Sequence, residues 1–290
     1  MERRNSPRWR HGSTRRRQSD GKIIGDLAMA FRNDALAGQH IVISGGCGAI
    51  GIGIVQKLMT HGANLTVNDI LPDQQAMDRL SQNGIDTAQI NYVKADLTDT
   101  AETDMLINAA RERFGPIHAA LCHIGMVIPK PLLEYRAEEW DETMAVNVRT
   151  AFLFGSAASR SMLEDNVKGQ LIFTTSWVAD VPWPEIGPYN ASKAAMKQLM
   201  RSFARELADK GIRANAVAPG IVSVGLAKQQ WDTDPTYRAR AQKAIPLGVM
   251  QPLDSVANAF LFLCSSAADY MTGTVLLVDG GCSLYPMDDA

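Results

Sequence analysis

The sequence predicts an α/β fold: a single doubly wound domain in which helices cover both faces of a seven-stranded parallel sheet. Short apolar runs alternate with segments of helical periodicity from Gln39 onward. The apolar runs are nearly continuous, which is typical of parallel strands buried on both faces. No internal repeat and no low-complexity linker follows residue 30, so one domain is expected rather than two.

Each element follows from its own segment of the chain. Apolar runs bounded by turn residues predict strands at 40–45, 64–69, 91–96, 117–122, 170–176, 212–218 and 274–279. Helical periodicity predicts helices at about 50–59, 101–113, 137–163, 189–209 and 254–265. Another helix begins after Pro72, because proline suits the first helical turn. The polar segment 222–246 is expected to be an irregular substrate lid.

Charge is distributed unevenly along the chain. Residues 1–17 hold seven arginines and one glutamate, whereas the remainder holds 22 basic and 30 acidic residues. The acidic body argues against nucleic-acid binding, which needs a basic face. Residues 1–28 are expected to form a disordered Arg-rich tail. Alternatively the start codon is misassigned and translation begins at Met29, or the tail serves targeting or nucleic-acid contact. Residues 29–290 make up the folded domain in each case.

The cysteines and histidines do not predict a metal site. The four cysteines lie in apolar or Gly-rich runs without a Cys-x-x-Cys pair, and the five histidines form no His-Glu-x-x-His pattern. Buried thiols in a reducing compartment are expected. The longest apolar runs fall short of the roughly 20 residues that span a bilayer, and no secretory signal is recognisable. The expected protein is cytoplasmic, with no metal and no membrane partner.

The first predicted strand ends in a glycine-rich turn that predicts a phosphate site. The turn runs Ser-Gly-Gly-Cys-Gly-Ala-Ile-Gly from residue 44 and leads into a helix. Glycines let the backbone approach a pyrophosphate, and the helix N-terminus offers free N–H groups. The candidate contacts are Gly45, Cys47, Gly48, Ile50 and Gly51. No lysine follows at the spacing of a nucleoside-triphosphate loop.

Asp69 ends the second predicted strand, near the offset expected for an acid that binds a ribose 2′-hydroxyl. Its charge disfavours a 2′-phosphate, and neither Asn68 nor Ile70 supplies a compensating cation. NAD is therefore expected rather than NADP. Asp96 and Leu97, after the third strand, are expected to border the adenine.

A tyrosine and a lysine predict acid–base chemistry. Tyr189 and Lys193 are four residues apart, so they share one face of a helix. An ammonium group near a phenol favours the phenolate, which would let Tyr189 exchange protons near neutral pH. Ser176, at the end of the preceding strand, could meet the same substrate oxygen.

These motifs together resemble those of the classical short-chain dehydrogenase/reductase family, over about residues 36–286. The glycine-rich motif corresponds to residues 44–51, with serine for threonine and alanine for the middle glycine. The family's catalytic asparagine, serine, tyrosine and lysine match Asn147, Ser176, Tyr189 and Lys193. Its Pro-Gly turn after the sixth strand matches Pro219 and Gly220, and its C-terminal Val-Asp-Gly-Gly matches residues 278–281.

The resemblance implies a Rossmann-fold oxidoreductase with NAD across the carboxyl ends of the strands. Tyr189 would take the proton of the substrate hydroxyl while hydride leaves for the nicotinamide. Lys193 would lower the pKa of Tyr189 and bind the nicotinamide ribose, and Asn147 would hold a water that links Lys193 to solvent. Ser176 would hold the substrate oxygen.

The sequence departs from the family pattern in two places. The usual Asn-Asn-Ala-Gly after the fourth strand is replaced from Cys122 to Gly125, so the asparagine bonds that brace the sheet are absent. The backbone of Cys122 and Gly125 is still expected to line the cofactor. The usual threonine after the Pro-Gly turn is Val224, and Ser223 or the backbone of Val222 is expected to substitute for it.

The Pro-Trp-Pro segment at 182–184 and the end of the chain, Gly280 to Pro286, are most similar to the glucose 1-dehydrogenase-like branch. This implies a sugar-like or polyol substrate flanked by Trp177 and Trp183. His123 is expected either to contact the substrate or to have a structural packing role. A secondary-alcohol, ketone or 3-oxoacyl reductase is the alternative. A non-catalytic, NAD-binding regulatory protein also remains open.

The two helices that follow Asn147 and Tyr189 are apolar around more than one stripe, which predicts a second buried face on each. In the resembling family the matching helices pair across a two-fold axis, and the C-terminal strand makes a second such contact. A homotetramer is therefore expected, with the end of the chain from Leu284 to Pro286 near a neighbouring subunit.

Overall fold

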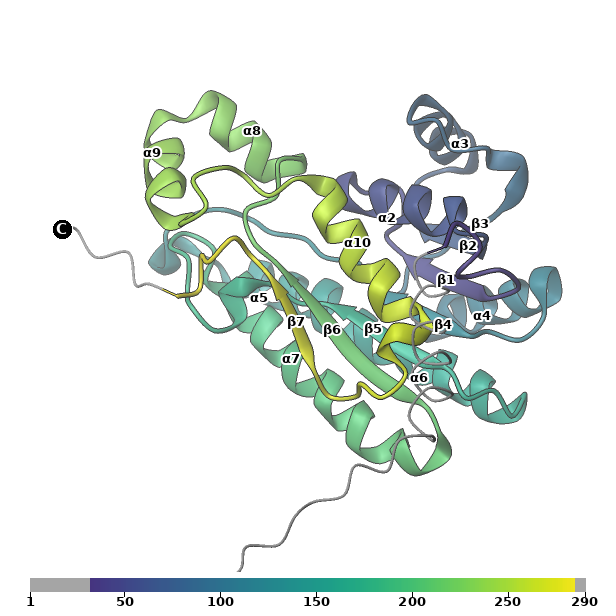
Figure 1. Cartoon of the computed structure of the whole chain (residues 1–290). Helices are drawn as coiled ribbons and strands as arrows, with labels where there is room; N and C mark the ends of the chain where they lie inside the picture. Colours follow the sequence, from purple (N-terminus) through teal and green to yellow (C-terminus); the bar gives the residue numbers. More distant parts are fainter. Residues whose placement is uncertain (1–31, 285–290) are drawn as a thin grey trace, which may run out of the picture.

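The computed structural model describes residues 32–284 of the chain (Figure 1). The predicted Arg-rich tail at 1–28, the alternative start at Met29, and Tyr285 and Pro286 lie outside the described residues.

Seven parallel strands form one sheet in the order β3-β2-β1-β4-β5-β6-β7 (Figure 1). They are β1 (His40–Ser44), β2 (Asn64–Asp69), β3 (Ile90–Lys94), β4 (Ala119–Cys122), β5 (Gln170–Thr174), β6 (Arg213–Pro219) and β7 (Val275–Val278). The chain reverses its winding direction between β1 and β4, which places a crevice at the carboxyl ends of these two strands. The predicted doubly wound Rossmann fold is confirmed.

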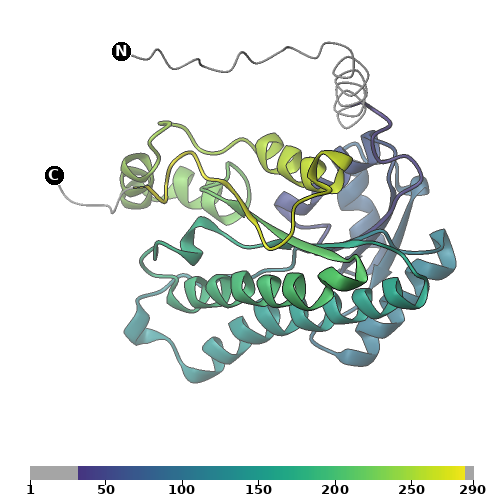
Figure 2. The ribbon, with the colours of Figure 1, turned by 60° about the horizontal axis from the view of Figure 1, so that its bottom comes forward.

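Helices form a layer on each face of the sheet (Figures 1 and 2). Residues of α2 (Ala49–Thr60), α3 (Asp73–Gln82) and α10 (Leu253–Cys264) share one apolar core with the sheet. Residues of α4 (Thr100–Phe114), α6 (Thr150–Glu164) and α7 (Gly187–Leu207) share a second core on the opposite face.

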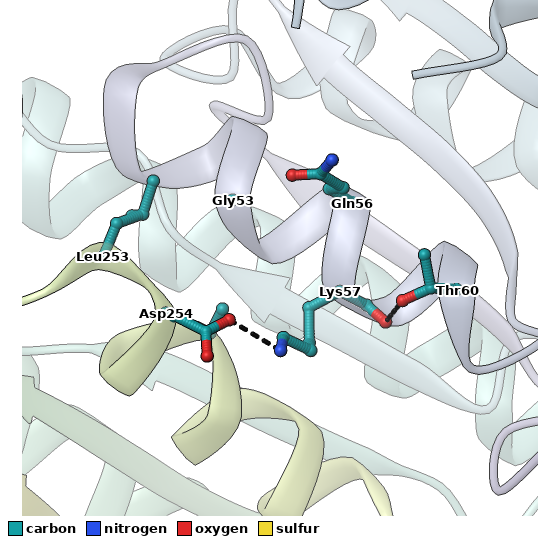
Figure 3. Close-up of a pocket in the computed structure, with 7 residues that line it drawn as sticks. Gly53, Gln56, Lys57, Thr60, Leu253 and Asp254 are labelled. Carbon is teal, nitrogen blue, oxygen red and sulfur yellow. Dashed lines mark hydrogen bonds and ion pairs between the residues drawn. The ribbon is translucent and has the colours of Figure 1, made fainter. Parts of the chain in front are cut away.

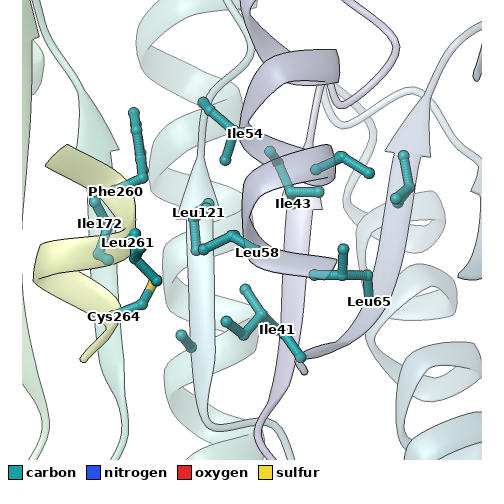
Figure 4. Close-up of a cluster of buried hydrophobic side chains, with 14 of the residues drawn as sticks. Ile41, Ile43, Ile54, Leu58, Leu65, Leu121, Ile172, Phe260, Leu261 and Cys264 are labelled. Atoms are coloured by element: carbon teal, nitrogen blue, oxygen red, sulfur yellow. The ribbon is translucent and has the colours of Figure 1, made fainter. Parts of the chain in front are cut away.

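Strand β1 shows why both faces are covered. Ile41 and Ile43 point into the first core, against Ile54 and Leu58 of α2 (Figure 4), whereas Val42 points into the second. All five side chains are fully buried. Alternate residues of a strand face opposite sides, so a continuous apolar run requires cover on both.

Helix α2, which follows the glycine-rich turn, is held against α10 (Figure 3). A Cβ on Gly53 would lie 2.7 Å from Cγ of Leu253, so the missing side chain allows the two helices to approach closely. Lys57 and Asp254 form an ion pair across the same seam at 2.6 Å. An open cavity of about 380 Å³ adjoins these residues, but none of the predicted catalytic residues lines it.

The segment predicted as an irregular lid is mostly helical. It contains α8 (Gly225–Thr233) and α9 (Pro235–Ala244). The Asp234 side chain accepts hydrogen bonds from the backbone N–H groups of Thr236 and Tyr237, and Pro235 occupies the first turn of α9. Asp followed by Pro is a helix-start signal that the polar composition of the segment concealed.

The long helix predicted at 137–163 is interrupted. It consists of α5 (Ala137–Met144), a π-helical turn at Ala145–Arg149, and α6. Single π turns within helices occur frequently at functional sites, because the extra residue redirects a side chain. The turn here carries Asn147, which is fully buried.

Replacement of Gly51 by alanine tests the packing of the turn against α2. The new Cβ would lie 2.4 Å from the backbone oxygen of Gly45 and 2.9 Å from the backbone of Gly46, and backbone atoms cannot move aside as a side chain can. We expect Gly51→Ala to lower the free energy of unfolding by about 1–3 kcal/mol in urea denaturation, despite the better helix propensity of alanine.

Gly53→Ala is the matched control in the same helix. The three atoms nearest to its Cβ would all belong to the side chain of Leu253, which can change rotamer, so a smaller loss is expected. An equal or larger loss for Gly53→Ala would contradict the assignment of Gly51 as the tighter constraint.

Candidate active site

The glycine-rich turn forms a backbone cradle at the carboxyl end of β1. Gly45 has a φ of +70°, a conformation that favours glycine, and its Cβ would also lie 3.2 Å from Ile124. Gly48 precedes α2 as its N-cap residue without a side chain to cap it, and the first turn of α2 contains no acidic residue. The first N–H groups of α2, those of Ile50 and Gly51 among them, are therefore available to an anion such as a pyrophosphate.

The structure brings Asp69 beside this turn. Its carboxylate accepts hydrogen bonds from the N–H groups of Cys47, at 3.1 Å, and Ile70, at 2.9 Å. The Cys47 thiol itself is buried in the core, and burial raises its pKa to about 12, with the Asp69 charge acting in the same direction. Cys47 can thus contact a cofactor only through its backbone.

Asp96 and Leu97 follow the end of β3. The Asp96 carboxylate accepts hydrogen bonds from the N–H and hydroxyl of Thr98, whereas the Leu97 side chain is buried in the second core. Their placement next to the sheet edge is compatible with a border of the adenine site.

Ser176, Tyr189 and Lys193 come together beyond the end of β5. The Ser176 hydroxyl hydrogen-bonds the Tyr189 phenol, and both residues line one cavity. The Lys193 ammonium lies 5.3 Å from the centre of the Tyr189 ring and donates to the backbone oxygen of Thr174 at 2.8 Å. Lys193 is only 2% exposed.

The electrostatics differ from the expectation that Lys193 lowers the pKa of Tyr189. Burial raises the pKa of Tyr189 to about 12, opposed only by the hydrogen bond with Ser176. Burial also lowers the pKa of Lys193 to about 7, since a buried ammonium loses its hydration. Desolvation is therefore the largest influence on the pKa of each group.

Asn147 occupies a bracing position. Its side chain accepts from the Met126 N–H at 2.8 Å and donates to the Met126 oxygen at 3.0 Å and to the Ser192 hydroxyl at 2.8 Å. Both amide hydrogens are thereby committed. The expected link from Asn147 through a water to Lys193 stays a prediction, which would use an acceptor oxygen of Asn147 rather than its amide hydrogens. A Cβ on Gly125 would lie 3.2 Å from the Lys193 nitrogen and 3.8 Å from the Asn147 oxygen, so Gly125 keeps this corner open.

The sheet is braced in a way that the sequence did not reveal. The Ser44 hydroxyl donates to the Leu121 oxygen and accepts from the His123 N–H, linking β1 to the end of β4. The His123 ring hydrogen-bonds the Thr174 hydroxyl at 2.8 Å and packs edge-on against Phe260. These bonds brace the sheet in the region where the asparagine bonds of the family pattern are absent.

His123 is also not among the residues that line the cavity with Ser176 and Tyr189. Burial lowers its pKa to about 3, and the Lys193 charge acts in the same direction, so the ring is neutral. Its contacts support the packing role rather than a substrate contact. Cys122, next to it, is buried at the end of β4.

The Pro-Gly turn after β6 approaches β7 closely. A Cβ on Gly220 would lie 2.7 Å from the backbone of Asp279, and the Gly220 N–H donates to the Gln251 side chain at 2.7 Å. Val222 pairs with Gln251 in an isolated parallel bridge. The chain is thus fixed from Pro219 to Val222, where the resemblance places the nicotinamide carboxamide.

A cavity of about 150 Å³ contains Ser176 and Tyr189. Its walls include Trp177, whose ring packs edge-on against Trp183 at 5.5 Å; Trp183 in turn packs against Tyr237 at 5.9 Å. Both predicted tryptophans therefore flank the cavity. The sequence reasoning missed several further lining residues, because no short motif marks them: Val127, Pro129, Glu185, Ile186, Gln230 and Tyr237.

Residues 32–284 contain neither a candidate membrane span nor a candidate metal site. None of the helices there is long and apolar enough to cross a membrane. No group of three or more His, Cys, Asp or Glu residues in that range is arranged to hold a metal ion.

Comparison with known proteins identifies the family. A family model described as "Enoyl-(Acyl carrier protein) reductase" matches residues 38–283. The chain is 34% identical over 256 residues to short-chain dehydrogenase reductase 5 of Arabidopsis thaliana, covering 86% of this chain and 96% of the relative. The chain belongs to the short-chain dehydrogenase/reductase family.

Other relatives of this dehydrogenase/reductase act on different compounds. This chain is 31% identical over 253 residues to 3β-hydroxysteroid dehydrogenase 1 of Eggerthella lenta. The match covers 87% of this chain and 97% of that protein. The crystal structure of a gluconate 5-dehydrogenase from Burkholderia cenocepacia, in complex with NADP and tartrate, superposes with a TM-score of 0.80 at 26% identity. That match covers 89% of this chain and 100% of the other. The protein is accordingly an oxidoreductase that acts on CH–OH groups with a nicotinamide cofactor.

The predicted role of Tyr189 is tested by Tyr189→Phe. The substitution removes only the phenol oxygen, so we expect kcat to fall about 10²–10⁴-fold, the range typical of a general acid or base. Cofactor affinity, measured by fluorescence titration, should remain within a few-fold, because the glycine-rich turn and Asp69 lie on other elements. Retention of more than about a tenth of kcat would overturn the assignment.

Proposed function

We propose that this protein is an NAD-dependent dehydrogenase that interconverts a secondary alcohol and its ketone. The observation that carries the proposal is one cavity lined by both Ser176 and Tyr189, with the Lys193 ammonium over the Tyr189 ring. A hydroxyl donor and a phenol that face one space can hold and deprotonate a single substrate oxygen.

The residues at the carboxyl edge of the sheet fit a dinucleotide. The uncapped N-terminus of α2 suits the pyrophosphate, and Gly45 leaves the backbone of the turn accessible. Gly125, next to the Lys193 nitrogen, and the fixed turn at Gly220 would border the nicotinamide end. When bound, the nicotinamide supplies the acceptor or donor of hydride.

Asp69 favours NAD over NADP. Its two bonds from backbone N–H groups leave other lone pairs of the carboxylate for ribose hydroxyls. The same negative charge would repel a 2′-phosphate. The Burkholderia relative was solved with NADP, so cofactor choice within this family is not fixed by the fold and has to be argued from this residue.

The chain's own residues account for proton transfer. Ser176 donates a hydrogen bond to the substrate oxygen in both directions of the reaction. The neutral phenol of Tyr189, which burial favours, donates its proton in ketone reduction, and the phenolate form takes the hydroxyl proton in alcohol oxidation. Lys193 keeps its position through the Thr174 oxygen and has further hydrogens for a ribose hydroxyl. Asn147 acts as a positioning residue, since it fixes the Met126 backbone and the Ser192 hydroxyl one helical turn from Tyr189.

The cavity walls favour a substrate with an apolar, ring-like body. Most of the lining is apolar, with the aromatic pair Trp177 and Trp183 and the aliphatic residues Val127, Ile221 and Leu226. A polyol would need a partner for each buried hydroxyl, and the lining offers only a few polar side chains beyond Ser176 and Tyr189. A sugar-like substrate remains the second candidate because flat aromatic faces suit the C–H faces of sugars.

Cofactor choice is tested by a double substitution at the end of β2. Asp69→Ala combined with Ile70→Arg removes the repelling charge and adds a cation beside the ribose. We expect the ratio of kcat/KM for NADP over NAD to rise by about tenfold or more. The Ile70→Ala variant is the control for loss of the exposed Ile70 side chain alone, and an unaltered ratio in the double variant would show that another residue selects the cofactor.

We also propose that the protein forms a homotetramer. Phe152 on α6 is 50% exposed, Met105 on α4 is 47% exposed, and Trp140 on α5 is 40% exposed. Exposed large apolar side chains on neighbouring helices favour a surface that another subunit covers. In the resembling family the matching helices of two subunits pair across a two-fold axis.

Multi-angle light scattering at micromolar concentration measures the assembly directly. We expect four times the 31.6 kDa chain mass. Phe152→Glu should lower the measured mass, because the charge would be buried in the interface. A monomer mass for the wild-type protein would refute the proposal. A dimer mass would contradict the second two-fold interface and leave the first one standing.

A further inference from the structure

The substrate cavity carries a second set of polar side chains apart from Ser176 and Tyr189. They are Glu185, Gln230 and Tyr237. Gln230 belongs to α8 and Tyr237 to α9, so two of the three come from the lid helices. The rest of the lining is mostly apolar. A few polar groups in an apolar pocket usually recognise polar groups of the ligand, so these three side chains are candidates for substrate recognition.

An aromatic row leads from the catalytic end of the cavity to this set. Trp177 directly follows Ser176 in the chain and contacts Trp183, whose ring contacts that of Tyr237. Two ring-to-ring contacts, at centroid distances of 5.5 Å and 5.9 Å, therefore separate Tyr237 from the neighbour of the catalytic serine. An apolar ring of a substrate would fit along such a row.

The two lid side chains have unused hydrogen-bonding capacity. Within residues 32–284, neither the Gln230 amide nor the Tyr237 hydroxyl makes a side-chain hydrogen bond to protein, although both residues are half-buried at the cavity. Half-buried polar groups that face a cavity need a partner from solvent or from a ligand. The amide and the hydroxyl can each donate and accept.

Glu185 is held in place at a conformational cost. Its φ of +65° is rare for a residue with a side chain, and such strain persists mainly where the surroundings impose it. The backbone oxygen of Glu185 accepts a hydrogen bond from the Lys130 N–H at 2.8 Å. The Glu185 carboxylate lies 3.4 Å from the Arg240 guanidinium on α9. These bonds tie the residue to the loop after β4 on one side and to the lid on the other.

The charges in this set indicate what it can bind. The Glu185 carboxylate disfavours an anionic group, and the adjacent Arg240 disfavours a cationic one. A neutral hydroxyl can donate to Glu185 and exchange hydrogen bonds with Gln230 or Tyr237. We propose that Glu185, Gln230 and Tyr237 form a second recognition site, which selects alcohols carrying a further hydroxyl joined to the reacting carbon through an apolar ring.

This inference rests on the proposed alcohol dehydrogenase function and is tested with two nearly isosteric probes. Cyclohexane-1,4-diol carries the second hydroxyl, and 4-methylcyclohexanol replaces it by a methyl group. For the wild-type protein with NAD, we expect kcat/KM for the diol to exceed that for the methyl compound by about tenfold or more. Gln230→Leu and Tyr237→Phe should each lower this ratio by about threefold or more.

Gln229→Leu is the matched control, because Gln229 is the exposed neighbour on the same helix and does not line the cavity. It should keep the wild-type ratio. A wild-type ratio near one, or variants that lower kcat/KM for both probes by the same factor, would overturn the second site while leaving the dehydrogenase function intact. Absence of Tyr189-dependent turnover of both probes would instead contradict the proposed function, and this inference with it.

Discussion

The site depends on one buried charge, the ammonium of Lys193. Its nitrogen donates to the Thr174 backbone oxygen at 2.8 Å and lies over the Tyr189 ring. A charge taken out of water is tolerated only when the surrounding groups are fixed to receive it. The neighbouring structure meets this condition: Gly125 leaves room for the nitrogen, and the π-helical turn aims Asn147 at the adjoining backbone.

The same Thr174 connects the lysine to the sheet. Its hydroxyl hydrogen-bonds the His123 ring, which is kept neutral by burial and by the nearby ammonium. The Ser44 hydroxyl then links the His123 N–H to the end of β1, where the glycine-rich turn begins. A chain of hydrogen bonds thus joins the predicted cofactor turn to the predicted catalytic lysine across three strands, at the crevice that the strand order creates.

The sequence predicted the seven strands and the principal helices because buried parallel strands and amphipathic helices leave strong local patterns. It also predicted Ser176, Tyr189 and Lys193 as neighbours, since helical spacing brings the last two together. Three features escaped prediction. The helical lid was hidden by polar composition, and the π turn has no sequence signature. The hydrogen bond by which His123 braces the sheet depends on a partner 51 residues away in the chain. Desolvation of Tyr189 likewise requires the packed structure, because spacing alone gives proximity without burial.

The charge state of Lys193 tests the account most directly. Protein labelled with ¹³C at the lysine ε-carbon can be titrated by NMR, with the Lys193→Met variant identifying the resonance. Burial lowers the Lys193 pKa to about 7, so the account predicts a protonated side chain below that pH and a neutral one above it. A Lys193 resonance that titrates like those of exposed lysines, near a pKa of about 10.4, would contradict the claim that this lysine is desolvated beside Tyr189.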